Sequence, residues 1–333
     1  MFSTATFLGI LNLCLVIIAM IIFLLIFIII FIHHEELNDI SLVLTCNTCL
    51  AAFLTTITEF IMTISNLTTG FLMYNLYICY GWGLFYDIFE CSIYHSYCLQ
   101  ALFRLCRVVF HKKKSLLSFS LYNILIIGQW LISIGLFIPT IVLKWYIHLP
   151  TETYCLVPYT DIGASIYLII ILYLIPLVSI SLIYAWITKF IRSSAHPTTL
   201  IIVTKQRQRN LRDLTVIKRI VILILILIVL RLPTIIFIIY GVIVGHLYSL
   251  TYSIVGLITS TFLIMIGLVT INITPQLKKN IFMFVFCQDS RVHIHQIPLR
   301  PLEPIDTVQG NIIGTRPIVI INARKHVNTK NKF

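Results

Sequence analysis

The fold class is decided by residues 7–32, which read FLGILNLCLVIIAMIIFLLIFIIIFI. The run contains no charged residue, and as a helix it is long enough to cross a hydrocarbon core about 30 Å thick, which needs roughly 20 residues. It is too long for the core of a signal peptide, it lacks a basic leader, and no small-residue cleavage site follows it. We therefore expect it to remain in the mature protein as a membrane-spanning helix.

The whole chain shares this apolar composition. Of its 333 residues, 59% are hydrophobic and 11% are charged, whereas a water-soluble domain carries about 25% charged residues. The nine cysteines are too sparse for a disulfide-rich secreted scaffold, and their spacing is not that of a zinc module. The composition argues against soluble enzymes and zinc modules, and we expect no catalysis, no metal and no cofactor.

Six further apolar runs of spanning length follow the first one. No internal repeat is visible, which disfavours a transporter built from inverted repeats. The pattern predicts an all-α fold, a seven-transmembrane helix bundle. The seven runs are Phe7–Ile32, Ile40–Ile64, Phe71–Arg107, Leu117–Leu143, Ile162–Ile187, Leu214–Tyr240 and Leu250–Ile273.

The basic residues predict the orientation, because loops rich in Lys and Arg stay in the cytoplasm. Of the 24 Lys and Arg residues, all except Lys144 and Arg231 fall on one side of the predicted bundle. This places the N-terminus outside and the C-terminus in the cytoplasm, at the plasma membrane. The net charge of +12 then attracts anionic membrane lipids rather than nucleic acid. Residues 1–6 leave no room for a folded extracellular domain.

Polar residues in the third run recur at spacings of three and four, which places them on one helical face. Charged side chains that face lipid are costly, so this face should point into the bundle and the third helix should be central. A tyrosine stripe of this kind can also serve only to pack and hydrogen-bond between helices. The stripe consists of Tyr80, Gly83, Asp87, Glu90, Tyr94, Tyr97, Ala101 and Arg104.

Two charged residues fall at matching membrane depth. Glu90 lies about 21 Å along a helix from the cytoplasmic end of its run, and Arg231 lies about 20 Å from the same membrane face. A buried charge is tolerated when it is paired, so we expect a salt bridge between them. Alternatively, Arg231 extends towards the interface or contacts an anionic ligand. Glu59 and Asp87 then remain without a basic partner, which favours a cationic amine or a basic peptide as ligand unless they are protonated.

Several landmarks occur in a fixed order. Cys79 stands 25 residues before Arg104, and Cys155 follows the fourth run. With these landmarks, residues 7–287 resemble the rhodopsin-like (class A) G-protein-coupled receptors, especially divergent invertebrate orphan members. In that family, a cysteine and an arginine at this spacing belong to a disulfide and to an Asp-Arg-Tyr motif. The other matching landmarks are Trp130, Pro176, Tyr184 and Pro233.

The resemblance implies a receptor that binds a small molecule or short peptide within the bundle and activates a heterotrimeric G protein. It implies a Cys79–Cys155 disulfide, and coupling through Arg104 and Tyr184. The last run contains no lysine, which excludes a retinal Schiff base. The alternatives are a seven-helix transporter or channel, or a receptor-like partner that does not signal. The expected ligand pocket consists of Glu59, Tyr86, Asp87, Glu90 and Arg231.

The sequence departs from the family at several motifs. The Asp-Arg-Tyr motif reads Phe103-Arg104-Leu105, so the acid that restrains the arginine is missing and basal activity is expected. Ala52 stands where the family has its sodium-binding aspartate, so no sodium site is expected. Arg231 replaces the tryptophan of the Cys-Trp-x-Pro motif, and the Asn-Pro-x-x-Tyr motif has no clear equivalent.

The region after the last run resembles the short amphipathic eighth helix of the family. Thr274 is a suitable N-cap and Pro275 a suitable first-turn residue, so we expect a membrane-surface helix over residues 274–287. Cys287 at its end is a candidate for palmitoylation or a free thiol. Residues 288–333 are polar and rich in proline, and we expect them to be disordered. Asn66 begins a glycosylation sequon, but it lies so close to the membrane that we expect no glycan.

Overall fold

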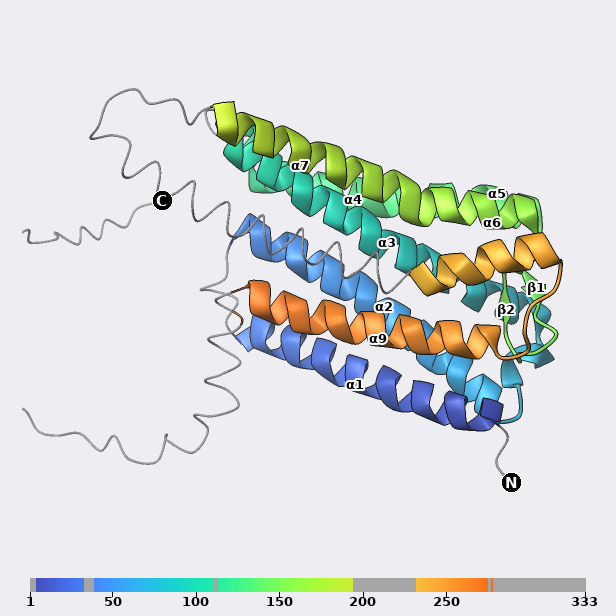
Figure 1. Cartoon of the computed structure of the whole chain (residues 1–333). Coiled ribbons are helices and arrows are strands. Elements are labelled where there is room, and N and C mark those ends of the chain that lie inside the picture. Colours follow the sequence, from blue (N-terminus) through green and yellow to red (C-terminus); the bar gives the residue numbers. More distant parts are fainter. Residues whose placement is uncertain (1–3, 33–38, 111–112, 194–231, 275–276, 278–333) are drawn as a thin grey trace, which may run out of the picture. The chain divides into compact units, whose positions relative to one another are not determined.

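The computed structural model describes residues 4–32, 39–110, 113–193, 232–274 and 277. Within these residues, long helices run side by side (Figure 1). A two-stranded antiparallel hairpin covers one end. The α-helices are α1 (Thr4–Ile32), α2 (Ile40–Leu67), α3 (Leu76–Val108), α4 (Phe119–Leu136), α5 (Ile138–Val142), α6 (Ile162–Leu168), α7 (Ile175–Ser193) and α9 (Thr251–Ile273). The shorter elements are η1 (Phe71–Tyr74), η2 (Lys114–Leu117), β1 (Ile147–His148), β2 (Cys155–Leu156) and η3 (Ile169–Leu174).

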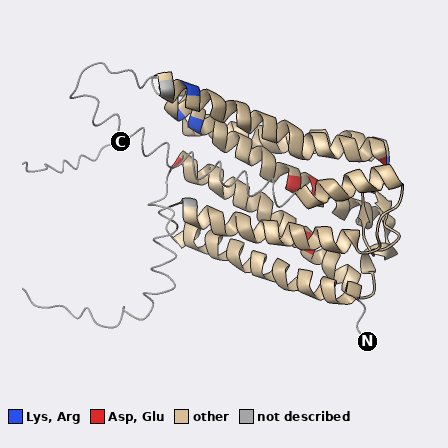
Figure 2. Ribbon diagram, viewed as in Figure 1, with Lys and Arg blue, Asp and Glu red and all other residues tan. Residues whose placement is uncertain are grey.

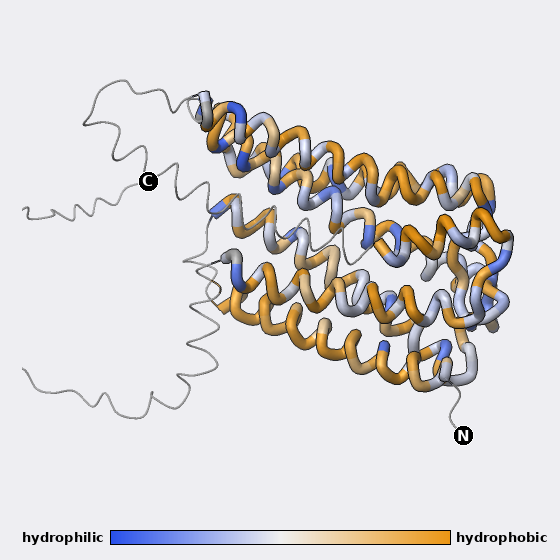
Figure 3. Tube along the Cα trace, viewed as in Figure 1, coloured by the Kyte–Doolittle hydropathy of each residue, from blue (hydrophilic) through white to orange (hydrophobic). Residues whose placement is uncertain are grey.

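Each of the seven predicted runs contains a helix. Among the described residues, five helical spans are long and apolar enough to cross a membrane: α1, α2, α4 with α5, α6 to α7, and α9. Apolar residues line these spans along most of their length (Figure 3). The helix α3 is equally long but more polar, and the apolar helix Leu232–Val244 begins at the edge of the described residues. The chain is a multi-pass membrane protein.

The helix α3 is central, as its polar stripe predicts. It packs against α2, α4 and α7, while α1 packs against α2 and α9. The largest buried cluster joins five of these helices, and includes Phe23 of α1, Ile93 of α3, Ile187 of α7 and Phe262 of α9. Because α3 contacts helices on several sides, most of its side chains other than those at its first turns are covered.

Two prolines interrupt helices that the sequence predicts as continuous. Proline lacks an N–H group and its ring clashes with the carbonyl four residues earlier. Pro139 accordingly lies in the first turn of α5, directly after α4 ends at Leu136. Pro176 lies just after η3, a π-helical turn between α6 and α7. A π-turn accommodates one extra residue without breaking the helix, so α6, η3 and α7 remain one span.

Five of the six threonine hydroxyls of α2 are satisfied within the helix itself. Thr45, Thr48, Thr55, Thr56 and Thr58 each donate a hydrogen bond to the backbone carbonyl four residues earlier. Such bonds remove the cost of placing a hydroxyl in an apolar environment. The helix α2 therefore carries many polar residues and still qualifies as a membrane span.

A polar network fixes α2 against α4 in the middle of the bundle. The Asn47 amide donates to Gln129 Oε1 at 2.7 Å, and the Trp130 indole N–H donates to Asn47 Oδ1 at 2.9 Å. Gln129 in turn donates to the carbonyl of Ser92 on α3 at 3.1 Å. All these groups have partners within the protein, so the network is structural.

The two ends of the bundle differ in chemistry. We call the end with β1, β2 and Cys79 the disulfide end. The opposite end carries Arg104, Arg107 and Lys189, and we call it the basic end (Figure 2).

Residues 275–276 and 278–333 lie outside the described residues, so the predictions for the eighth helix, for Cys287 and for the tail fall outside them too.

Candidate functional site

Three acidic residues of α2 and α3 are buried inside the bundle. Glu59 of α2, Asp87 of α3 and Glu90 of α3 are 5%, 6% and 3% exposed. Asp87 and Glu90 are close enough to interact electrostatically. The inward direction that the stripe predicts for these two residues is confirmed.

Asp87 has a hydrogen-bond donor from a loop. The Tyr146 hydroxyl, between α5 and β1, donates to Asp87 Oδ2 at 2.8 Å, and both residues are buried. Tyr146 lies 59 positions from Asp87 in the sequence, and a pattern of helical spacings does not relate residues so far apart. The partner is a phenol and not a base, and it reaches the carboxylate because the loop folds back into the bundle.

Glu59 also has a partner, on α9. The Ser260 hydroxyl contacts Glu59 Oε1 at 2.9 Å and also bonds to Asn12 Oδ1 of α1. The Asn12 amide donates to Thr63 Oγ1 of α2 at 3.0 Å. This buried network joins α1, α2 and α9. Glu59 thus has a hydrogen-bond partner, which the sequence alone does not indicate. The signal for this network in the sequence is the presence of two polar residues, Asn12 and Ser260, within apolar runs.

Two tyrosines complete the interior. Tyr86 of α3 donates to Thr259 Oγ1 of α9 at 3.5 Å. Tyr173 of η3 donates to Glu90 Oε1 at 3.3 Å. Three of the five predicted pocket residues, Glu59, Tyr86 and Glu90, bond to α9 or η3. A fourth, Asp87, bonds to the loop. The fifth, Arg231, lies outside the described residues, so the predicted salt bridge to Glu90 stays a prediction.

The loop between α5 and α6, residues 143–161, covers this interior at the disulfide end. Cys155 of β2 forms a disulfide with Cys79 of α3, with their Cα atoms 5.4 Å apart. The disulfide implied by the family resemblance is therefore present. A Cβ on Gly83 would lie only 2.3 Å from the Cys155 carbonyl oxygen. Glycine at this position lets the loop backbone rest directly on α3.

An acid of this loop, Glu152, links α2 and α9. It accepts hydrogen bonds from the Asn66 amide of α2 and from Ser253 Oγ of α9, the latter at 3.1 Å. Asn66 Oδ1 also accepts a bond from the Thr153 backbone N–H at 3.1 Å. Glu152 is 5% exposed, and its burial raises the pKa of its carboxyl group, while the bonds from Ser253 and Asn66 lower it. Sequence reasoning missed this residue because it lies in a loop without periodicity.

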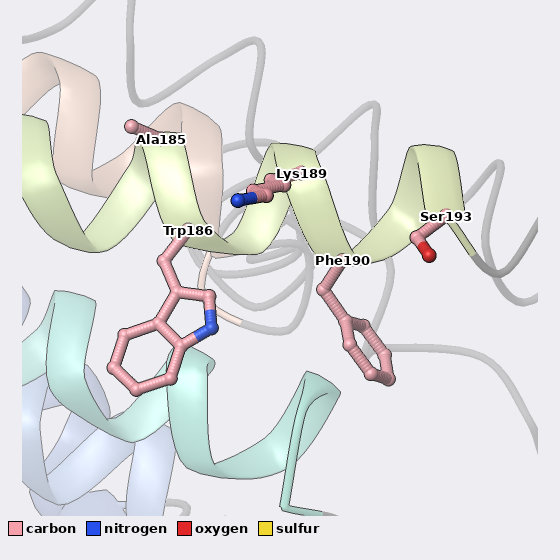
Figure 4. A pocket seen from close by; sticks show the side chains of 5 residues that line it. All are labelled: Ala185, Trp186, Lys189, Phe190 and Ser193. Atoms are coloured by element: carbon pink, nitrogen blue, oxygen red, sulfur yellow. The ribbon is translucent and has the colours of Figure 1, made fainter.

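The basic end contains the two predicted coupling residues. Arg104 of α3 is half-buried and interacts electrostatically with Tyr184 of α7, which is 7% exposed. Further along α7, the side chains of Trp186, Lys189 and Phe190 line a shallow pocket (Figure 4). The Trp186 ring meets the Phe110 ring edge-on at 6.0 Å, which connects the ends of α3 and α7. No pattern in the sequence indicates this aromatic and basic surface.

The comparisons with known proteins support the fold. No protein-family model matches the sequence, and no curated protein matches it. Among solved structures, the chain is similar to squid rhodopsin, with a TM-score of 0.71 and 16% sequence identity over 85% of this chain and 87% of the rhodopsin chain. At this identity the likeness concerns the fold. It confirms the predicted all-α fold, a seven-transmembrane helix bundle.

Proposed function

We propose that this chain is a G-protein-coupled receptor of the rhodopsin-like class, which passes a signal from a ligand in the bundle to a heterotrimeric G protein. The observation that carries the proposal is the arrangement around α3. One end of this central helix is bonded through Cys79 to a loop that covers the interior, and the other end carries Arg104 beside Tyr184. This combination links a ligand-facing end to a partner-facing end through one rigid element.

The proposed orientation has the disulfide end outside the cell and the basic end in the cytoplasm, at the plasma membrane. Two independent features support it. Basic residues gather at the cytoplasmic ends of membrane helices, and disulfides form and persist in oxidising environments. The boundaries proposed for the parts of the chain are residues 1–6 outside, 7–273 in the bundle, 274–287 at the membrane surface and 288–333 in the cytoplasmic tail.

The proposed ligand is a small molecule or short peptide that carries positive charge. Its pocket would be formed by Glu59, Tyr86, Asp87, Glu90 and Arg231. Because Glu90 is expected to pair with Arg231, the two other buried acids, Glu59 and Asp87, favour a cationic amine or a basic peptide. The first four residues come from α2 and α3 and face the covered interior, and Arg231 is included on the depth reasoning and the family resemblance.

The proposed G-protein site lies at the basic end. Phe103 precedes Arg104 in place of the acid of the Asp-Arg-Tyr motif, so we expect basal signalling without ligand. In the same proposal, membrane lipids contact the apolar outer faces, and a palmitoyl group on Cys287 would tether the membrane-surface helix.

Basal G-protein recruitment in living cells tests the proposal. Wild-type protein should recruit G protein above the background of untransfected cells, and Arg104→Ala should abolish most of the excess. Arg107→Ala is the matched control, because Arg107 is an exposed arginine in the last turn of the same helix. The coupling role would be refuted if Arg104→Ala reached the surface normally and recruited G protein as well as wild type.

A further inference from the structure

The loop carboxylate of Glu152 lies where three elements meet. The residue belongs to the loop between α5 and α6, Asn66 belongs to the last turn of α2, and Ser253 belongs to the first turn of α9. Each carboxyl oxygen accepts one bond, Oε2 from Asn66 and Oε1 from Ser253. A single side chain thus holds the loop to one helix at a point 86 positions earlier in the sequence and to another at a point 101 positions later.

We propose that Glu152 is a proton-regulated latch, which holds the α5–α6 loop against α2 and α9 more firmly when its carboxyl group is protonated. The proposal concerns the opening of the loop and does not depend on coupling to a G protein. If the proposed receptor function is correct, the latch would also regulate access to the acidic interior, because Tyr146 in the same loop bonds to Asp87.

Both hydrogen bonds survive protonation. In the acid form, Oε2 can remain the carbonyl oxygen that accepts from the Asn66 amide. The proton then resides on Oε1 and is donated to Ser253 Oγ, because a serine hydroxyl both donates and accepts. The protonated latch therefore keeps its two connections and no longer holds a negative charge away from water.

The direction of the pH effect follows from linkage. Burial raises the pKa of Glu152 above its ordinary value of 4.5, and the bonds from Ser253 and Asn66 only partly oppose this. An open loop would expose the carboxyl group to water, so the closed loop binds the proton more tightly than the open one. The stabilisation of the closed loop is fully present at a pH below the ordinary pKa of the Glu152 carboxyl group. It is lost as the pH rises through the raised pKa that this group has in the closed loop.

The groups that face Glu152 do not reverse this direction. Tyr154 of the loop and Tyr252 of α9 interact with it electrostatically, and Tyr154 also interacts with Glu59 of α2. No lysine or arginine among the described residues interacts with Glu152 in these contacts. The hairpin also contains His148, which pairs with Cys155 across the two strands. The test must therefore separate the carboxyl group from this histidine.

The test is amide hydrogen exchange of loop residues 147–157 in the full chain, reconstituted in lipid nanodiscs and corrected for the intrinsic pH dependence of exchange. As the pH rises from roughly 5 to roughly 8, protection of the wild-type loop against exchange should fall. The fall should be up to about tenfold for each pH unit between the ordinary and the raised pKa of Glu152. Glu152→Gln preserves both bonds, with its amide donating to Ser253, and should give high protection that does not change with pH.

Three variants complete the test. Asp161→Asn is the matched control, because Asp161 is an exposed acid of the same loop whose side chain caps α6, and it should retain the wild-type pH dependence. His148→Gln should retain it too. Ser253→Ala removes a bond that favours the charged form, so its transition should move to higher pH. The proposal is overturned if wild-type protection is constant, if Glu152→Gln still responds to pH, or if either control abolishes the response.

Discussion

Replacing Gly83 with alanine should destabilise the contact between α3 and the α5–α6 loop. The added Cβ would lie 2.3 Å from the Cys155 carbonyl oxygen and 3.2 Å from a Tyr146 ring carbon, whereas ordinary contacts begin at 3.4 Å. The two backbones would have to separate by about 1 Å, and overpacking of this kind costs about 1–3 kcal/mol. The loop cannot shift freely, because its Cys155 forms a disulfide with Cys79, which lies one turn before Gly83 in α3.

The helix itself gains a little from alanine, about 0.5–1 kcal/mol over glycine, so the expected net loss is about 1 kcal/mol. Gly81→Ala separates the two effects, because nothing lies within 4 Å of a Cβ at that position. The purified proteins can be unfolded in detergent by heat or by denaturant. The stability of Gly81→Ala should equal or exceed that of wild type, and the stability of Gly83→Ala should be lower. Equal stability of the two variants would show that the loop does not rest on α3 as described.

Three other predictions concern bonds between elements. Cys79→Ser and Cys155→Ser should each lower the free energy of unfolding by about 2–5 kcal/mol, and the double variant should lose no more than either single one; unchanged stability of both single variants in the same unfolding assay would contradict this. Glu90→Arg and Arg231→Glu should each reduce surface expression measured by flow cytometry, and the combined swap should restore it; a swap that fails to rescue argues against the salt bridge. The Asn66 amide donates to the loop carboxylate, and we therefore expect no glycan on Asn66. Glycosidase treatment should leave the electrophoretic mobility unchanged, and a shift in mobility would contradict this prediction.

The helical framework was predictable because hydrophobic runs act locally. A segment such as residues 7–32 must form its backbone hydrogen bonds internally in lipid, whatever its neighbours do. The same reasoning predicts the central place of α3, because Asp87 and Glu90 cannot face lipid. The boundaries shift where proline acts on the helix, as at Pro139, whose effect on α4 and α5 the sequence does not reveal.

The partners of the buried acids were not predictable. Tyr146 and Glu152 lie in a loop, and a loop has no periodicity that would indicate which residues reach the interior. The contacts to Asp87, Asn66 and Ser253 depend on how the loop crosses the end of the bundle, which the disulfide and Gly83 determine together. The family resemblance predicts the disulfide but is silent on the other contacts.

The internal hydrogen bonds of the α2 threonines have a consequence for biosynthesis. A helix that enters the membrane before its neighbours exist must leave no hydroxyl seeking a partner in lipid. Thr45, Thr48, Thr55, Thr56 and Thr58 meet this condition without any other helix. Their polarity is therefore compatible with early insertion of α2. The later arrival of α4, the α5–α6 loop and α9 supplies the contacts of Asn47, Asn66 and Glu59.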